Sequence, residues 1–438
     1  MTYSIRATLL ALLICGATLW GQQKTPAPAN AQVQAAAESV GKYIRADPKG
    51  VEELFTPQFL AQISPSQLQA LLAKLYAQLG TVTAVHFVGQ QASGTAAFDF
   101  EFSKGYQAPV LLTLNGEAAH NIAGFRIGGP IPIHDSVAAL LSDMRALPGS
   151  VSFLAEKLNG NQPTTVAQWQ ADKPLAIGST FKLYILGALT QQVAEGKMHW
   201  DQVARLETHS LASGQLQGWP LGTPLTLQSL ASLMISISDN TAADQLLHTV
   251  GRERVEAQQS AMGSGHAALN QPFLTTWEMF QLKYGDAGRR QTFLSDGAAA
   301  RRSLLASLAP SATPELSAKL EAASSGTGPR EIENLEWLES ASDICHALAW
   351  FHAPESDRNR ATARSILAIN RGLPLSASKW TYIGFKGGSE PGVISLDFLL
   401  RSKTGAWYAV SAIWNNPRAA VNEQQWALLT SRAIDLLE

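Results

Sequence analysis

Cysteine is nearly absent from the sequence, because the 438 residues contain only Cys15 and Cys345. So few thiols exclude a disulfide-stapled scaffold, zinc ribbons and iron–sulfur clusters. The sequence also has no His-Glu-x-x-His, no P-loop and no Gly-x-Gly-x-x-Gly between a strand and a helix. A Gly-x-Ser-x-Gly elbow is missing as well. We therefore predict a protein that uses no metal and no other cofactor.

Strong charge of one sign is missing too. Lys and Arg total 33 against 35 Asp and Glu, which gives a formal net charge of −2. This balance offers no electrostatic reason to expect nucleic acid or an anionic membrane surface as a partner. The apolar fraction of 46% supports ordinary buried cores and excludes wholesale disorder. At roughly 100–200 residues per domain, the length predicts two or three domains.

Long apolar runs are confined to the N-terminus. Residues 7–20 form a charge-free, mostly apolar stretch that follows Arg6. A membrane-spanning helix needs about 20 apolar residues, so this stretch is too short to span a bilayer and instead fits a secretion signal. We predict a signal peptide over 1–21 and a flexible tether over 22–31, with an uncleaved anchor as the alternative. The mature protein is then expected to be secreted or periplasmic, without a membrane attachment.

Residues 32–128 carry the pattern of a small α+β domain. Helical patterns come first, and Ser64 with Gln67 forms a capping box at the start of one of them. The period then changes to two, since apolar residues occupy every second position of 96–102. Further strands are expected at 110–114 and 121–127. This order is similar to cystatin-like or NTF2-like modules, and we predict an accessory role in packing or substrate gating.

A Gly- and Pro-rich segment, 129–134, is predicted to link this domain to a second one. The second domain is expected to span 135–438. Within it, residues 286–330 are rich in Ala, Ser and Pro and indicate a helical excursion with loops.

The first chemically suggestive cluster is Ser-Thr-Phe-Lys at 179–182, ahead of a long helical pattern that ends at Gly196. Ser179 would lie at the helix start, with Lys182 one turn later on the same face. A serine hydroxyl is a poor nucleophile until a base removes its proton, and a buried neutral lysine can be that base. Because Ser-x-x-Lys also opens ordinary surface helices, this motif alone does not decide the function.

Two more clusters follow. Ser238, Asp239 and Asn240 lie between two helical patterns, where a hydroxyl and a carboxamide could pass a proton and hold an amide carbonyl. These three are also common turn residues. Lys386 ends an apolar strand pattern, and the glycines at 387–388 would let a substrate approach the backbone closely. A plain strand ending in a glycine turn is the alternative.

A literal Lys-Thr-Gly occurs at 403–405, but it separates two strand patterns and indicates a hairpin turn. Placing the third cluster there would leave one strand before the terminal helix. Placing it at Lys386 leaves two, so we assign the cluster to Lys386.

In this order, the three clusters resemble the signature of class A β-lactamases and related penicillin-recognising serine enzymes: Ser-x-x-Lys, Ser-Asp-Asn and Lys-Thr-Gly. The resemblance covers 135–438. The run 384–392 and the small first domain are further similar to a two-domain branch related to a serine hydrolase of clavulanic-acid biosynthesis. The family implies an α+β fold in which an antiparallel sheet with flanking helices adjoins an all-helical lobe. The implied strands lie near 151–158, 166–170, 381–386, 393–400 and 407–413.

The resemblance implies a role for each matched side chain. Ser179 would be the acylating serine, and Lys182 its base or proton relay. Ser238 would pass the proton to the leaving nitrogen. Asn240 would hold the substrate amide, while Asp239 would brace the turn without reacting.

In the third cluster, Lys386 would supply the cation. Backbone N–H groups of Ser179 and Ser389 would form the oxyanion hole, with Gly388 beside them as part of the substrate-binding strand. One departure is Gly387, which stands where the family usually has Thr or Ser. A hydroxyl contact to the substrate carboxylate is therefore missing, and Ser389 is the candidate replacement.

A second departure concerns deacylation. The class A loop Glu-x-x-Leu-Asn has its nearest match in His-Ala-Ala-Leu-Asn at 266–270, and only four residues separate it from Thr275. His266 could act as the base, because the reference pKa of histidine is about 6.5. A loop histidine with no proton to move is the equal alternative. We therefore predict acylation and leave the rate of turnover open.

These inferences predict an exported serine hydrolase that attacks a β-lactam through an acyl-enzyme, with antibiotic resistance as the expected consequence. An esterase or D,D-peptidase acting on an ester or a peptidoglycan-like substrate is the near alternative. A penicillin-binding module that does not turn over is the more distant one. We expect a monomer whose partner is a small molecule.

Overall fold

The computed structural model describes most of the chain after the predicted leader. The signal peptide predicted over 1–21 and most of the tether lie outside the described residues. Contacts divide the chain into two compact units, Met1–Ser136 and Val137–Glu438. Within the described residues, no helix is both long and apolar enough to span a bilayer. The described ranges are 31–92, 94–115, 122–158, 162–211, 213–326, 328–352, 354, 356–376 and 378–437.

Helices open the first unit. The predicted capping box is confirmed, because Ser64 Oγ accepts a hydrogen bond from the backbone of Gln67 and the Gln67 side chain accepts one from the backbone of Ser64. The capped helix is amphipathic and buries Leu68 and Leu72. The elements are α1 (Ala31–Lys42), η1 (Val51–Leu54), α2 (Pro57–Leu60) and α3 (Pro65–Leu79).

An antiparallel sheet follows, in the order β1-β2-β3-β4. Its alternating strand is confirmed, since Phe98, Phe100 and Phe102 are buried while the residues between them are partly exposed. The segment predicted as a linker contains β5, which pairs with β3. The strands are β1 (Val82–Ala92), β2 (Thr95–Phe102), β3 (Tyr106–Leu114), β4 (Ile122–Ile127) and β5 (Ile131–Pro132).

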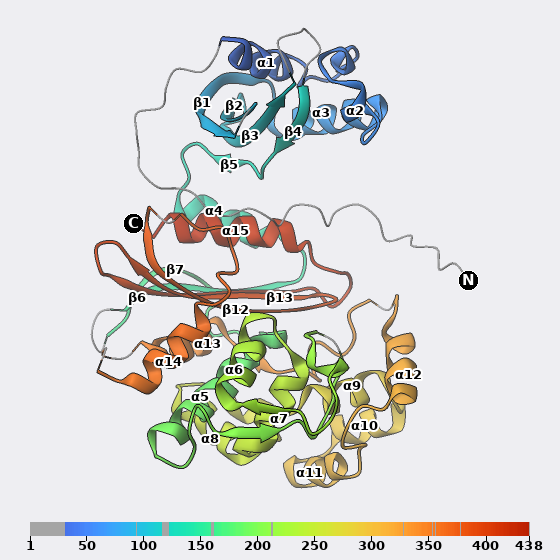
Figure 1. The fold of residues 1–438 in the computed structure, drawn as a ribbon, viewed down its shortest axis with the longest axis vertical. Coiled ribbons are helices and arrows are strands. Elements are labelled where there is room, and N and C mark those ends of the chain that lie inside the picture. The colour runs from blue at the N-terminus through green and yellow to red at the C-terminus, as the bar shows by residue number, and fades with distance from the viewer. Residues whose placement is uncertain are drawn as a thin grey trace. The chain divides into compact units, whose positions relative to one another are not determined.

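A second antiparallel sheet, in the order β12-β13-β14-β6-β7, organises the larger unit (Figure 1). All five predicted strands are confirmed, each extended by a few residues at most. Residues 403–404 form the turn between β13 and β14, as predicted, and Gly405 has a φ of 89°. The strands are β6 (Ser150–Leu158), β7 (Thr164–Trp169), β12 (Trp380–Glu390), β13 (Val393–Ser402) and β14 (Trp407–Asn415).

Helices cover both faces of this sheet, which confirms the predicted α+β architecture (Figure 1). On one face, α4 (Val137–Arg145) and α15 (Glu423–Asp435) pack through a core that includes Trp426 and Trp414. On the other face lies the helical lobe, built around the buried helix α5. It includes α5 (Lys182–Ala194), α6 (Leu227–Ser236), α7 (Asn240–Val250), α8 (Arg252–Ala261), α9 (Thr276–Tyr284), α10 (Ala287–Ser295), α11 (Ala298–Ala306), α12 (Pro314–Ser324), α13 (Ala341–Phe351) and α14 (Arg358–Leu367).

Short elements complete the lobe and its contact with the sheet. The 3₁₀ helix η2 (Gly178–Phe181) leads directly into α5. A small ribbon pairs β8 (Leu175–Ala176) with β11 (Leu338–Glu339). The others are β9 (Val203–Arg205), β10 (Pro224–Thr226), η3 (Leu216–Gly218) and η4 (Ala267–Asn270).

The packing of α15 on the sheet predicts a large stability effect at Trp426. This side chain is fully buried, and its Nε1 donates to Ala412 O at 3.1 Å. Trp426→Ala should lower the free energy of unfolding by about 3–5 kcal/mol, because it leaves a cavity that the rigid sheet cannot fill. Urea denaturation measures the change. Trp219, which is 40% exposed, is the control, and Trp219→Ala should stay within roughly 0.5 kcal/mol. Equal losses would contradict this account of the core.

Candidate active site

Ser179 lies in η2, immediately before α5. Gly178 has a φ of 48°, so the chain turns sharply into the 3₁₀ helix at a position that favours glycine. Lys182 is the first residue of α5, and its Nζ lies 3.0 Å from Ser179 Oγ. The two side chains that the sequence analysis paired are therefore brought into hydrogen-bond contact.

The amine of Lys182 is fully buried behind Ser179. Besides Ser179 Oγ, its oxygen neighbours are Ser238 O at 2.6 Å, Asn240 Oδ1 at 2.7 Å and Ser238 Oγ at 3.1 Å. The first two can only accept, so they match the two N–H groups of a neutral amine and leave its lone pair for a hydroxyl. Burial holds the pKa of Lys182 well below its usual range, and the charge of Lys386 lowers it further.

The second cluster forms the turn between α6 and α7. Ser238 has a φ of 57°, an uncommon conformation for a residue with a side chain. Asp239 caps α7, since its Oδ1 accepts from Ala242 N at 2.8 Å. Its Oδ2 accepts from Gln215 N at 2.6 Å. These contacts hold the turn, so Asp239 is occupied structurally while Ser238 and Asn240 point to Lys182.

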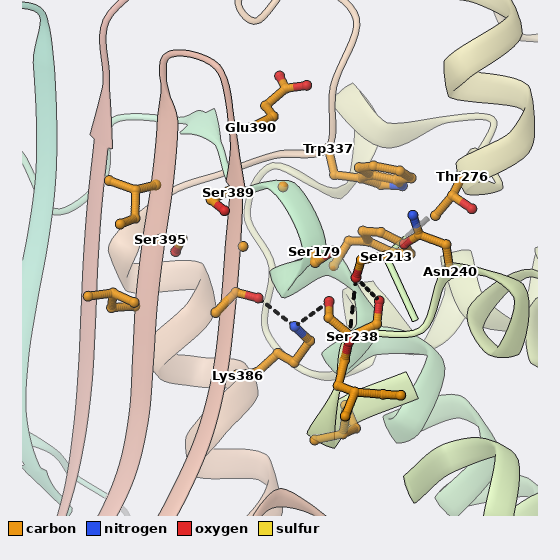
Figure 2. Close-up of a pocket in the computed structure, with 18 of the residues that line it drawn as sticks. Ser179, Ser213, Ser238, Asn240, Thr276, Trp337, Lys386, Ser389, Glu390 and Ser395 are labelled. Atoms are coloured by element: carbon orange, nitrogen blue, oxygen red, sulfur yellow. Dashed lines mark hydrogen bonds between the residues drawn. The ribbon is translucent and has the colours of Figure 1, made fainter. Parts of the chain in front are cut away.

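Lys386 reaches the same turn from β12 (Figure 2). Its Nζ donates to Ser238 Oγ at 3.1 Å and to Gly387 O. The Ser238 hydroxyl thus lies between two amines, one from the helical lobe and one from the sheet. Burial lowers the pKa of Lys386 to about 7, while Asp397 acts in the opposite direction.

The glycines after Lys386 serve the protein's own packing. A Cβ at Gly388 would lie 2.1 Å from Ile177 O and 2.5 Å from Ser179 N. Only glycine lets β12 and η2 approach this closely. Gly388 also lines the cavity, so its predicted place in the substrate-binding strand stays a prediction. At Gly387 a Cβ would lie 2.7 Å from the Phe385 ring.

Asp397 is a buried residue of β13 that the sequence analysis missed. Its carboxylate accepts from Thr180 Oγ1 at 2.7 Å and from Ser395 Oγ at 2.6 Å, while Ser411 Oγ donates at 2.7 Å. Burial raises the pKa of Asp397 to about 6, against the effect of these hydrogen bonds. Because Thr180 follows Ser179, the carboxylate anchors the nucleophile segment to the sheet. The sequence feature that could have identified Asp397 is the presence of polar residues in the otherwise apolar run 393–400.

These groups open onto a cavity of about 450 Å³ between the sheet and the helical lobe. Ser179, Ser238, Asn240 and Lys386 line it, and Lys182 does not. Figure 2 shows Ser389 and Trp337 on its walls. Trp337, which lines the cavity, stacks on Phe181 with ring centroids 3.7 Å apart.

Residues 132–318 match the model of the beta-lactamase enzyme family. This segment belongs to the β-lactamase family. The matched range includes Ser179, Lys182 and the turn 238–240, but it ends before Lys386. The place of Lys386 in the site therefore rests on the geometry above.

Solved structures are similar to about two thirds of the chain. A β-lactamase from Sphaerobacter thermophilus DSM 20745 shows 20% identity and a TM-score of 0.45, covering 68% of this chain and 94% of that chain. An acyl-enzyme complex of PBP-A with penicillin G shows 16% identity and a TM-score of 0.46, covering 69% and 96%. An ancestral class A β-lactamase shows 15% identity and a TM-score of 0.47, covering 68% and 99%.

His266 lies in the larger unit, immediately before η4. It is not among the residues that line the cavity, and its Nδ1 lies 2.6 Å from Asp343 Oδ2. Asp343 caps α13. Asn270, at the end of the same loop, bonds to the backbone of Leu338 instead of facing Ser179. The structure thus does not bring His266 to the nucleophile, because this loop packs on β11 and α13.

Ligands for a metal ion do not gather in the described ranges, where no group of three His, Cys, Asp or Glu side chains is arranged to hold one. Cys345 is buried in α13 as a free thiol.

The anchoring of η2 to the sheet of the larger unit predicts a stability effect at Thr180. Thr180→Val should lower the free energy of unfolding by roughly 1–3 kcal/mol, because buried Asp397 loses a donor. Thr190→Val is the matched control: its hydroxyl is equally buried but donates only to Leu186 O in its own helix. The control should lose less than roughly 1 kcal/mol. Chemical denaturation compares the two, and an equal loss would count against the anchoring role.

Proposed function

We propose that the protein is a serine hydrolase that acts through an acyl-enzyme, with Ser179 as the nucleophile and Lys182 as the group that accepts its proton. The observation that carries the proposal is the 3.0 Å approach of the buried amine to Ser179 Oγ. No ion pair to Lys182 is found among the described residues, so desolvation decides its protonation. The family match over both residues supports the same assignment.

Acylation follows from these contacts. Ser179 Oγ bonds to the substrate's carbonyl carbon while its proton passes to Lys182 Nζ. When the tetrahedral species collapses, the C–N or C–O bond breaks and the leaving atom takes a proton from Ser238 Oγ. Lys182 resupplies that proton over 3.1 Å. Water then adds to the acyl ester and releases Ser179.

The oxyanion is the charge that develops in this step. The backbone N–H groups of Ser179 and Ser389 are the proposed donors, and such donors contribute about 2.7–4 kcal/mol each. The close approach at Gly388 supports this assignment, because it holds the Ser389 end of β12 against η2. The head of α5 adds a favourable dipole.

A β-lactam is the proposed substrate, since Lys386 supplies positive charge for a carboxylate beside the leaving group. Gly387 provides no hydroxyl for that carboxylate, so esters and peptidoglycan-like amides remain alternatives for the same machinery. We further propose that the protein is exported, on the basis of its predicted signal peptide.

A slow-turnover, penicillin-binding role is the second candidate. Among the described residues, no carboxylate is hydrogen-bonded to Ser179 or Lys182, and His266 lies outside the cavity. The carboxylates that line the cavity, those of Glu336, Glu390 and Glu423, make no hydrogen bond to either side chain in the described ranges, so none is held beside the acyl ester as a base for water. This observation favours a long-lived acyl-enzyme over rapid hydrolysis.

Intact-mass analysis after incubation with a penicillin tests the proposal. The wild type should gain the mass of one antibiotic. Ser179→Ala should gain none, because Ser238, the other hydroxyl in contact with Lys182, is the proposed proton donor and not the proposed nucleophile. Ser232→Ala is a control, since its hydroxyl donates only to Gln228 O in α6. A chromogenic cephalosporin and an ester then separate the candidates: steady hydrolysis of the first identifies a β-lactamase. An adduct on Ser179→Ala would rule out the proposed nucleophile.

The pH dependence of acylation tests the two amines. The rate should rise as Lys182 loses its proton and fall through a pH of about 7 as Lys386 loses its charge. In Lys386→Met a like charge is removed, so protonated Lys182 is less disfavoured and its pKa rises. The acidic limb should therefore move to higher pH.

The control for this shift is Lys197→Met, whose exposed amine pairs with Glu195. Its acidic limb should coincide with that of the wild type. An unmoved or lowered acidic limb in Lys386→Met would show that the two amines are not electrostatically coupled.

A further inference from the structure

A buried cluster of charges lies beside the proposed oxyanion site. Lys283 Nζ in α9 donates to Glu390 Oε1 at 2.7 Å and Oε2 at 2.9 Å, and it also pairs with Glu336. The side chains of Lys283 and Glu336 are 0% and 1% exposed, and that of Glu390 is 15% exposed. Nothing in the acylation chemistry above uses these three residues.

The cluster joins three walls of the cavity. Lys283 belongs to α9, Glu336 precedes Trp337, and Glu390 follows Ser389 at the end of β12. Trp337 in turn stacks on Phe181 of η2. Figure 2 shows Glu390, Ser389 and Trp337 around the same end of the cavity. A single ammonium thus connects the oxyanion strand, the aromatic wall and the helical lobe.

The charges of the cluster do not balance unless a proton is held. Burial and the charge of Glu336 together raise the pKa of Glu390 to about 8, although Lys283 acts in the opposite direction. Burial opposes the charge of Lys283, but both carboxylates outweigh it and raise the pKa of Lys283. A proton on Glu390 at neutral pH would balance the charge of Lys283 against that of the second carboxylate.

Other charged groups surround the cluster. Arg290 Nη1 donates to Lys283 O at 3.0 Å and pairs with Glu331 at 3.7 Å. Burial raises the pKa of Tyr284, and Arg330 lies 5.9 Å from its ring.

We propose that Lys283, Glu336 and Glu390 are positioning residues, which fix the Ser389 end of β12 and the Trp337 wall relative to Ser179. The effect of this positioning on catalysis rests on the proposed acyl-enzyme function. The structural connection that the cluster makes between the two walls, called the tie below, does not. Buried ion clusters of this kind contribute little net stability compared with apolar packing. Stability alone therefore does not require the cluster, whereas fixing the two cavity walls relative to each other does account for it.

Glu390→Ala and Glu390→Gln test the tie, with Arg432→Met as a control. Glu390→Ala leaves the Lys283–Glu336 pair in place, so the unit still folds. It removes the link through Lys283 between the end of β12 and the Trp337 wall, so both segments lose their mutual support. Glu390→Gln resembles the protonated side chain and should retain the contact. Arg432 is 5% exposed and pairs with Asp143 on the opposite face of the sheet.

Two measurements are made on the full chain. Hydrogen exchange of peptides covering 335–340 and 385–391 should speed up about tenfold or more in Glu390→Ala and remain near wild type in Glu390→Gln and Arg432→Met. The acylation rate constant for a penicillin should fall about tenfold or more in Glu390→Ala, with the half-saturating concentration within about threefold.

Unchanged exchange in both segments of Glu390→Ala would overturn the proposal, as would the same exchange response in Arg432→Met. A loss confined to the half-saturating concentration would overturn the catalytic part and make Glu390 a binding residue. If the wild type forms no acyl-enzyme while Glu390→Ala loosens both segments, the proposed function fails and the tie stands.

Discussion

The site depends on one interaction: a buried lysine amine in contact with a serine hydroxyl at the head of a helix. Removing an ammonium from water is expensive, and losing the proton avoids most of that penalty. Ser238 O and Asn240 Oδ1 accept the two remaining N–H groups of Lys182, which orients the lone pair. The positive charge of Lys386 reinforces the neutral state.

The rest of the larger unit holds distant segments around that amine. The nucleophile, the turn before α7 and the end of β12 are far apart in sequence but share the Ser238 hydroxyl or the contact at Gly388. Asp397 in β13 anchors η2 to the sheet through its hydrogen bond with Thr180. Both sides of the sheet are covered, so the strand that carries Lys386 is supported by the α15 core behind it. Rigidity of this kind is what a preorganised acyl-transfer site requires.

The local elements could be predicted because their signals are local. Alternation, glycine turns and caps indicated the strands of the larger sheet and the helix after Ser64. The Ser179–Lys182 pair followed from helical spacing. The long-range contacts could not be predicted in this way: Trp337, Asp397 and the Lys283 cluster meet the site only through tertiary packing. His266 was misplaced for the same reason, because sequence spacing does not show that Asp343 lies within reach of its ring. The two-residue pairing of β5 is too short to produce a pattern.

Direct titration of Lys182 tests the central claim most closely. NMR of protein labelled with ¹³C at lysine Cε reports each amine, and the signal missing in Lys182→Arg assigns the resonance. The account predicts that this resonance titrates well below the ordinary lysine value of 10.5 and is shifted upward in Lys386→Met. A Lys182 resonance that titrates near 10.5 would contradict the account, because a protonated amine cannot accept the proton of Ser179.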